Sequence, residues 1–350
     1  MNNFDFKLND GEAAVVLSEQ NRYYFTGFRS SDGVLLAFSD GNVLLIDGRY
    51  FEAAERTVKN AKVVLLKRFS EQLKNITAEK KIKTVFCENT VTVSQFEFLR
   101  KNVNGASVSA DEKFNSYIIN KRKTKSDFEI DCIKKAQEIA EKSLNEVLKI
   151  IKVGITEKQI AAELEYRMKL NGSDGASFDT IAISGKNTSL PHGVPTDKKV
   201  QNGEFITMDF GATYKGYHSD MTRTVAVGKI SDKMANVYDT VLSANLKGIA
   251  EIKSGVAAKT VDNAARSVIQ KSGYGEFFVH STGHGVGLDI HESPNVTIGN
   301  GELLKAGEII TVEPGIYLPD EFGVRIEDML CVEENSAYNL TNYKKSLIII

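Results

Sequence analysis

The segment MDFGATYKGYHSDMTRT (residues 208–224) has the pattern of two strands joined by a tight turn, yet it carries two aspartates. Side chains alternate along a strand, and Gly216 supplies the flexible backbone for a turn over residues 214–217. Folding there predicts that Asp209 and Asp220 are near-diagonal neighbours on one face, with Cα atoms about 7–8 Å apart. Two such carboxylates need a shared proton or a cation, unless both are solvated on an exposed face.

A second segment, TVEPGIYLPDEFGVRIEDM (residues 311–329), repeats this arrangement. Glu313 and Glu327 lie symmetrically about Asp320, and both interrupt apolar sequence. Aspartate and glutamate are depleted from strands. Four acidic side chains at strand positions in two separate hairpins therefore favour a cation site over exposed surface.

The histidines cluster in the same part of the chain. All five lie between the change of pattern near residue 122 and the second acidic segment: His192, His218, His280, His284 and His291. Three of them belong to VHSTGHGVGLDIHE (residues 279–292), where glycines let the backbone approach another group closely. The spacing is neither a dinucleotide-binding G-x-G-x-x-G nor the H-E-x-x-H of a zincin helix. Histidines beside carboxylates predict one metal ligand together with acid–base groups, while His218 is interpreted either as structural or as a residue that supports a ligand.

The chemistry of this donor set limits the ion. Oxygen-rich ligation with one nitrogen suits Mn²⁺, Co²⁺, Fe²⁺ or Zn²⁺ and excludes soft-ligand sites. Calcium prefers shells made only of oxygen, so a structural calcium site is the weaker alternative. Four carboxylates exceed the need of one divalent ion, whereas two ions about 3.5–4 Å apart would use them as bridges.

Composition excludes several other classes of protein. The chain has 350 residues and a formal net charge of −2, so neither a nucleic acid nor a membrane surface is an expected partner. The N-terminal residues lack the pattern of a signal peptide, and no apolar segment reaches membrane-spanning length. Three cysteines lie far apart, as in a protein with buried, reduced thiols, and we expect a cytoplasmic location.

The length favours two domains, and the pattern changes near residue 122. Residues 1–122 alternate short apolar runs with helical segments, which predicts a small α/β domain. The basic run at residues 121–125 is interpreted as a solvated linker rather than an anion site. Ser126 and Glu129 then form a capping box in front of a long amphipathic helix.

Residues 123–350 contain a faint internal repeat. KVGITEKQIAAELEYRMKLNG (residues 152–172) matches KSGVAAKTVDNAARSVIQKSG (residues 253–273) in register. Each copy predicts a turn, a helix with an apolar face and a glycine stop. Such a repeat is typical of a pseudo-twofold domain whose site lies between its halves.

Four blocks in this order resemble the metallopeptidase family that includes methionine aminopeptidase, aminopeptidase P and prolidase: MDFGATYKGYHSDMTRT, HSTGHGVGLDIHE, VEPGIY and GVRIED. The resemblance implies an α+β fold, with a pseudo-twofold pita-bread catalytic domain at residues 123–350. YYFTGFRSSDG and DGRYFEAAE are similar to the creatinase-type α/β domain that precedes it, here residues 1–122. The implied metal ligands are Asp209, Asp220, His284, Glu313 and Glu327, with Asp220 and Glu327 bridging two ions.

Within the family, the Xaa-Pro peptidases are the closer match. LPHGVPTD places His192 at the position of a substrate-binding histidine, and His280, His291 and Arg325 match further site residues. The resemblance therefore implies an Xaa-Pro aminopeptidase or dipeptidase that cleaves between an N-terminal residue and a following proline. Two divalent ions are expected, with Mn²⁺ first and Co²⁺, Zn²⁺ or Fe²⁺ as alternatives, in a homodimeric enzyme.

The same resemblance assigns roles to these residues. Glu313 is the expected general base, and His280 and His291 are the expected catalytic donors to the tetrahedral intermediate. His192, His291 and Arg325 are the expected contacts to a proline-containing peptide. Arg325 could equally orient ligand carboxylates.

Two alternatives from other classes stay open at this stage. One is a methionine aminopeptidase-like exopeptidase. The other is a non-catalytic peptide-binding or chaperone-like protein on the same fold, which would release no proline and require no metal for its activity.

Overall fold

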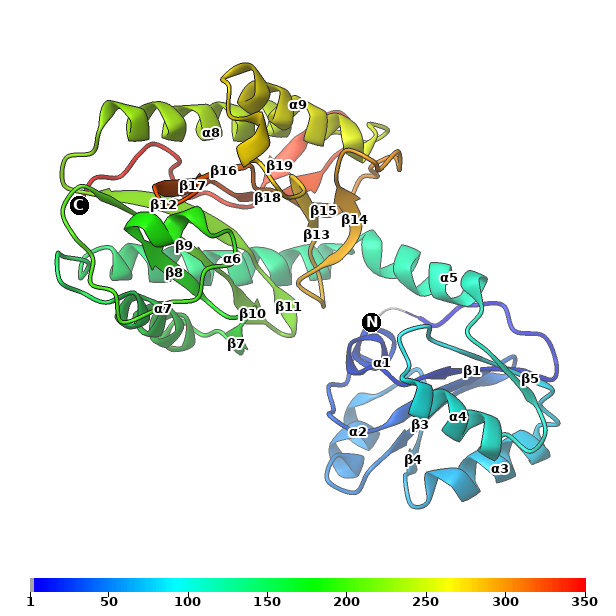
Figure 1. Cartoon of the computed structure of the whole chain (residues 1–350). Coiled ribbons are helices and arrows are strands. Elements are labelled where there is room, and N and C mark those ends of the chain that lie inside the picture. The colour runs from blue at the N-terminus through cyan, green and yellow to red at the C-terminus, as the bar shows by residue number, and fades with distance from the viewer. Residues whose placement is uncertain (1–2) are drawn as a thin grey trace. The chain divides into compact units, whose positions relative to one another are not determined.

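The computed structural model describes residues 3–350, and the chain divides into two compact units at residues 122 and 123. Figure 1 shows the helices and strands that make up the units. Among the described residues, no helix is both long enough and apolar enough to cross a bilayer. The three cysteines are free and buried, as predicted.

The first unit is built on one mixed sheet with the strand order β4-β3-β2-β1-β5-β6. Its strands are β1 (Glu12–Val16), β2 (Val34–Phe38), β3 (Gly41–Ile46), β4 (Lys62–Leu65), β5 (Thr84–Cys87) and β6 (Ser107–Ser109). Its helices are α1 (Glu19–Thr26), α2 (Phe51–Thr57), α3 (Phe69–Glu79), α4 (Val93–Asn102) and α5 (Glu112–Lys123). The sheet holds the unit together because Val15, Leu36, Leu45 and Val85 are almost fully buried in one core. The predicted α/β character is confirmed.

The basic run at residues 121–125, which begins in the last turn of α5, is not a solvated linker, and that interpretation is wrong. The side chains of Lys123 and Lys125 are 2% and 1% exposed. Lys123 pairs with Glu302 and lies 3.3 Å from Glu308, while Lys125 lies 3.1 Å from Glu292. Two buried ammonium groups are tolerated here because carboxylates from distant parts of the chain compensate them.

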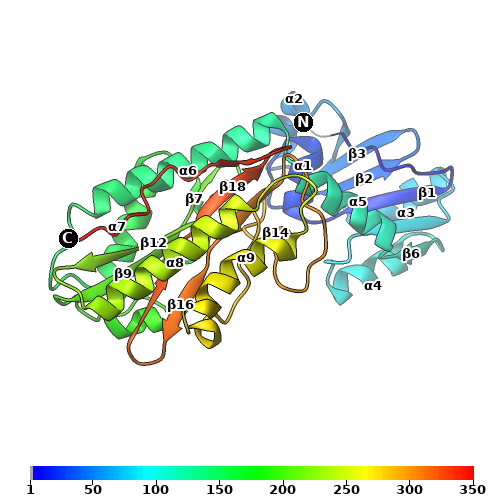
Figure 2. The same ribbon diagram turned by 90° about the horizontal axis from the view of Figure 1, so that it is seen from above.

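The second unit contains two helix pairs with strands between them. Its helices are α6 (Asp127–Val147), α7 (Glu157–Leu170), α8 (Asp232–Ala250) and α9 (Ala258–Lys271), with short 3₁₀ turns η1 (Gly185–Ser189) and η2 (Gly275–Phe277). Figures 1 and 2 show α6 and α7 on one side of the strands and α8 and α9 on the other. The capping box of α6 is present, since the Glu129 carboxylate accepts from the backbone N and the hydroxyl of Ser126.

The strands of the second unit form several antiparallel groups. The groups are β12-β9-β8, β11-β10-β7, β14-β13-β15-β18-β19 and β16-β17. The strands are β7 (Gly175–Ala176), β8 (Ile181–Ser184), β9 (Glu204–Phe210), β10 (Ala212–Tyr214), β11 (Tyr217–His218), β12 (Met221–Val227), β13 (Gly283–Gly285), β14 (Glu292–Val296), β15 (Ile309–Val312), β16 (Gly315–Leu318), β17 (Phe322–Arg325), β18 (Asp328–Val332) and β19 (Ala337–Asn339).

The internal repeat is confirmed. Helices α7 and α9 each have 14 residues. Each follows a turn with a left-handed glycine, Gly154 at φ 94° and Gly255 at φ 82°. The same backbone bond closes both turns, from Gly154 N to the carbonyl of Val200 (2.9 Å) and from Gly255 N to the carbonyl of Leu304 (2.8 Å). The two halves therefore share the same turn followed by a helix of the same length.

Strand β9 shows how the core directs side chains to the centre of this unit. Ile206, Met208 and Phe210 are buried against α6 and α7. Each buried apolar side chain of this size contributes about 1.5–3 kcal/mol to folding. Because side chains alternate, Asp209 must point to the opposite face, between the halves. The same alternation that packs the core thus positions the first acidic side chain.

Candidate metal centre

The first acidic hairpin has the predicted geometry. Its turn contains Lys215 at φ 48° and Gly216 at φ 78°, the two positive values that a tight hairpin turn requires. In the ladder between β9 and β12, Asp209 lies opposite Thr222. Asp220 precedes Thr222 by two residues, so the two aspartates are diagonal neighbours on one face, as predicted.

The second acidic hairpin brings its glutamates directly opposite each other. Val312 pairs with Asp328, and Gly315 pairs with Arg325, so the register between them places Glu313 opposite Glu327. The backbone N of Glu327 donates to the carbonyl of Thr222 at 3.2 Å. The two acidic hairpins are therefore hydrogen-bonded side by side.

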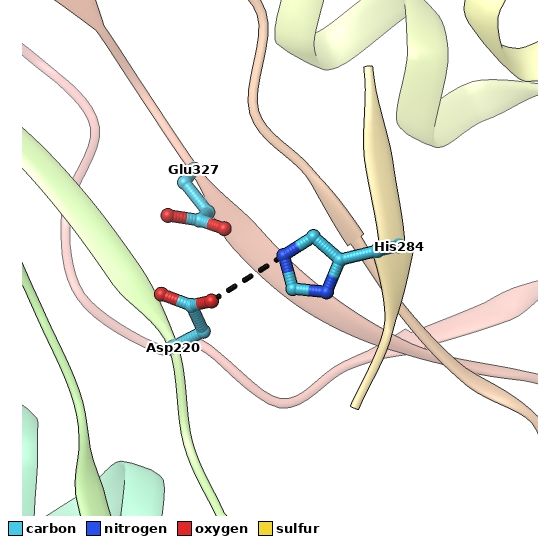
Figure 3. Close-up of side chains that lie close together, drawn as sticks. All are labelled: Asp220, His284 and Glu327. Atoms are coloured by element: carbon cyan, nitrogen blue, oxygen red, sulfur yellow. Dashed lines mark ion pairs between the residues drawn. The ribbon is translucent and has the colours of Figure 1, made fainter. Parts of the chain in front are cut away.

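His284 approaches these carboxylates from β13 (Figure 3). Glycines flank it because a Cβ at Gly283 would lie 2.0 Å from the carbonyl oxygen of Thr311. Its Nδ1 lies 3.0 Å from the carbonyl oxygen of Gly285, so Nδ1 carries the proton and Nε2 carries the lone pair. Nε2 lies 3.5 Å from Asp220 Oδ2 and 3.6 Å from Glu313 Oε1. A lone pair facing two carboxylates is repulsive unless a cation or a proton lies between them.

The donor set fits a divalent cation. Asp220, His284 and Glu327 offer ligand atoms that all lie within 4.8 Å of one another. Asp209 and Glu313 lie outside that compact group but line the same cavity of about 850 Å³. Asp209 Oδ1 is buried and has no hydrogen-bond partner among the described residues. A buried carboxylate oxygen without a donor is costly, and a metal ion would satisfy it.

Comparison with models of known protein families shows to which family the chain belongs. A family model described as metallopeptidase family M24 matches residues 131–334. A second model, described as the creatinase/prolidase N-terminal domain, matches residues 7–116. The chain belongs to metallopeptidase family M24. The family implies divalent metal ions, in agreement with the donor set.

Individual members of family M24 are similar along nearly the whole chain. An Xaa-Pro dipeptidase of Pyrococcus furiosus is 37% identical over 341 residues, which cover 97% of this chain and 96% of the relative. The solved Xaa-Pro dipeptidase from Bacillus anthracis has a TM-score of 0.93 at 36% identity, covering 97% of this chain and 95% of that chain. An X-Pro aminopeptidase from Thermotoga maritima has a TM-score of 0.91 at 36% identity, with 97% of each chain covered. The predicted fold is confirmed.

Electrostatics in this M24 site also point to a cation. Burial raises the pKa of Asp220 well above its ordinary value, and the charges of Glu327 and Asp209 raise it further. The pKa of Glu327 is raised by burial and then by Glu313 and Asp209. Burial raises the pKa of Glu313 to about 8. The raised pKa values favour the protonated forms of these carboxyls in the absence of metal, and a binding ion must displace the protons that they hold.

The metal-facing nitrogen of His284, Nε2, carries no proton that a binding ion must displace. Burial lowers the pKa of His284 to about 4, with the bond to Gly285 and the ring of His291 as smaller influences. The imidazole is therefore neutral at pH 7, which is the form that ligates a metal. Its contacts with Asp220 and Glu313 are consequently not ion pairs at neutral pH.

Arg325 lies behind the carboxylates and connects them. Its side chain is 4% exposed, and it donates to Asp209 Oδ2 at 2.6 Å and to the hydroxyl of Tyr317 at 2.8 Å. Its Nε donates to the hydroxyl of Thr222 at 3.1 Å, and that hydroxyl donates to Glu327 Oε2 at 2.7 Å. These contacts favour the interpretation that Arg325 orients ligand carboxylates.

Three histidines lie around the same cavity. His192, His280 and His291 line it together with the five predicted ligands and Arg325. The ring of His291 lies 4.4 Å from that of His284, edge to face. His280 donates from Nδ1 to the carbonyl of Ser281 and accepts at Nε2 from Tyr317, both at 2.8 Å. Burial lowers the pKa of His280 to about 4, and Arg325 lowers it further.

The sequence did not single out Tyr317 or Thr222. Tyr317 lies in an apolar strand and Thr222 in a strand rich in threonine and valine, so both resemble ordinary strand residues. Their hydroxyls nevertheless connect His280, Arg325 and Glu327. His218 is not among the residues that line the cavity, and its backbone N donates to the carbonyl of Gly287 at 2.9 Å.

Proposed function

We propose that the chain is a metallopeptidase that hydrolyses the bond between an N-terminal residue and a following proline. The observation that carries this proposal is one cavity lined by all five predicted ligands, by His192, His280 and His291, and by Arg325. Relatives named Xaa-Pro dipeptidase and X-Pro aminopeptidase support the substrate class. Proline's nitrogen carries no hydrogen, so recognition depends on ring shape and on contacts to carbonyl groups.

The proposed metal ligands are Asp209, Asp220, His284, Glu313 and Glu327, which would hold two divalent ions, with Mn²⁺ as the expected ion. When bound, such ions polarise the scissile carbonyl and lower the pKa of water so that it can attack near neutral pH. The carboxylates supply the negative charge that two such ions require. Asp220 and Glu327 belong to the compact group with His284 and are the residues that we propose would bridge the two ions.

Glu313 is the proposed general base. It lines the cavity at the end of β15, and its Oε1 lies 3.6 Å from His284 Nε2. A carboxylate there can accept a proton from the attacking water and pass it to the leaving nitrogen of proline.

The histidines around the cavity are the proposed contacts to the substrate. His291 would donate to the substrate carbonyl and stabilise the charge that develops on its oxygen. His280 Nε2 carries a lone pair, so it would exchange the bond that it accepts from Tyr317 for one that it accepts from an N–H or O–H of the substrate. His192 is exposed at the cavity and would contact the peptide beyond the scissile bond. Arg325 would act mainly by holding Asp209 and Thr222.

Peptide hydrolysis with added Mn²⁺ tests this proposal. We expect release of the N-terminal residue from Xaa-Pro dipeptides or from Xaa-Pro-Xaa peptides. Matched peptides with alanine in place of proline should be cleaved at least about tenfold more slowly, because a site built for one ring shape discriminates by a few kcal/mol. The comparison of dipeptide with tripeptide measures the preferred length, on which the named relatives differ.

Two outcomes would contradict the proposal. Equal cleavage of Met-Ala-Xaa peptides would favour the methionine aminopeptidase-like alternative. Binding of Xaa-Pro peptides without release of product would favour a non-catalytic peptide-binding protein.

We further propose that residues 123–350 form the catalytic domain and residues 1–122 a creatinase-like N-terminal domain. The match of a separate family model to residues 7–116 supports this division. A homodimer in the cytoplasm is proposed as well, and three free, buried cysteines are compatible with a reducing compartment.

A further inference from the structure

Lys125 is a buried cation that the proposed chemistry does not use. Its side chain is 1% exposed, and its ammonium lies 3.1 Å from Glu292 Oε2. The same ammonium donates to the carbonyl of Lys123 at 3.2 Å. Burying an ammonium is unfavourable unless its partner is held in place. The pair therefore fixes the Glu292 carboxylate relative to the first residues of this unit.

Glu292 closes the loop between β13 and β14. Its Oε1 accepts from the backbone N of Asp289 at 3.0 Å. Its backbone lies opposite Gly285 in the ladder between the two strands. A Cβ at Gly287 would lie 2.6 Å from Glu292 Oε2, so glycine leaves the space that the carboxylate occupies. One carboxylate thus lies against several positions of the loop formed by residues 286–291.

This loop carries His291 into the cavity. His291 directly precedes Glu292, and its ring lies edge to face against His284 with centroids 4.4 Å apart. The residue is exposed, so packing on its own side chain restrains it only weakly. Its position must therefore depend on the backbone of the loop, and through it on the Glu292 carboxylate.

We propose that Lys125 is a positioning residue for His291, acting through Glu292. This inference rests on the proposed function, because His291 contacts the substrate there. Residues that orient groups of a metal site commonly change activity by about 10–100-fold when they are replaced. Lys125 would act in this way without touching substrate or metal.

Replacement of Lys125 tests the inference against a matched control. Lys125→Met keeps the length of the side chain and removes its charge. We expect kcat/KM for an Xaa-Pro peptide to fall about tenfold while Mn²⁺ content is unchanged, and Lys125→Arg to recover most of the loss. Lys123→Met is the control, because Lys123 is equally buried but pairs with Glu302 and Glu308, outside this loop. It should retain kcat/KM within about twofold.

Combination with His291→Ala separates positioning from general destabilisation. If Lys125 acts through His291, then Lys125→Met should have little further effect on kcat/KM in the His291→Ala background. If the double variant instead loses kcat/KM by the product of the two single losses, the substitutions act independently and the proposal is overturned. Wild-type kinetics in folded Lys125→Met would overturn it as well.

Hydrogen exchange provides a readout that does not need turnover. The backbone amides of residues 286–291 should exchange faster in Lys125→Met than in the wild type, and unchanged exchange there would overturn the inference. Lys123→Met should leave exchange in this loop unchanged.

The failure of the proposed function and the failure of this inference can be distinguished. If the wild type cleaves no Xaa-Pro peptide, the proposed function fails, yet hydrogen exchange still reports on the loop. If Lys125→Met does not fold, Glu292→Gln replaces it, since glutamine keeps an acceptor for Asp289 N. Wild-type exchange and rate in Glu292→Gln would overturn the proposal.

Discussion

Asp220→Asn is expected to abolish measurable Xaa-Pro hydrolysis and to lower the bound Mn²⁺ from two ions per chain to about one. Asp220 is buried between Glu327 and His284, and its Oδ2 faces the lone pair of His284 Nε2. Asparagine has nearly the same shape but lacks the charge that a bridging ligand supplies. We expect a loss of at least about 100-fold in kcat/KM, with Mn²⁺ content measured by elemental analysis on the same sample.

The fold should survive this substitution. Burial, and then the charges of neighbouring carboxylates, raise the pKa of Asp220, so a neutral asparagine of nearly the same shape suits this position in the metal-free protein. The thermal midpoint of the metal-free variant should therefore be at least that of the wild type. Asp239→Asn, at an exposed position on α8, is the matched control and should change neither activity nor metal content. Full activity in Asp220→Asn would remove Asp220 from the proposed bridge.

His280→Ala is expected to lower kcat by about 100-fold, the loss typical of a positioned acid–base group, while leaving Mn²⁺ content near two. The ring of His280 lines the cavity, but its two nitrogens contact Ser281 and Tyr317 rather than the carboxylates. Loss of this residue should therefore affect the reaction and not the ions. Steady-state kinetics and elemental analysis of the same preparation measure both.

Tyr317→Phe serves as the comparison for His280→Ala. It keeps the ring and removes only the hydroxyl that contacts His280 and Arg325. A smaller loss of kcat than in His280→Ala is expected, because the imidazole itself is still present. Loss of both ions from His280→Ala would instead mean that His280 is a metal ligand.

The acidic hairpins could be predicted from the sequence because the two acidic residues of each pair lie on either side of a single turn. Asp209 and Asp220 lie close to one turn, and Glu313 and Glu327 lie symmetrically about another, so strand alternation alone relates the members of each pair. The internal repeat was likewise visible, because each helix has its own turn and glycine stop. That His284 joins the carboxylates followed from resemblance, since no local pattern relates residues so far apart.

Other features depend on long-range contacts that no local pattern contains. The basic run containing Lys123 and Lys125 looks solvated, because its partners Glu292, Glu302 and Glu308 come from much later in the chain. The same holds for the role of Tyr317, whose strand pattern is that of a core residue. The sequence of a charged run shows which residues it contains but not whether their side chains are buried.

The sequence also does not predict which buried carboxylates hydrogen-bond to the segments that carry the histidines. Glu157 accepts from the backbone N of Ser184 (2.7 Å) and of Thr196 (3.0 Å), at the two ends of the segment that carries His192. Asp262 accepts from the backbone N of Thr282 at 3.2 Å, close to His280. Both acidic residues lie on helices whose amphipathic pattern gives no sign of these contacts.

Calorimetric titration of Mn²⁺ into metal-free protein at pH 7 tests the central claim most directly. Repeating it in buffers with different ionisation enthalpies gives both the number of ions and the number of protons displaced. We predict two ions per chain with net release of protons, because the raised pKa values of Asp220, Glu313 and Glu327 favour their protonated forms before the metal enters. Absence of binding, or saturation at one ion in protein that cleaves Xaa-Pro peptides, would contradict a dinuclear centre formed by these side chains.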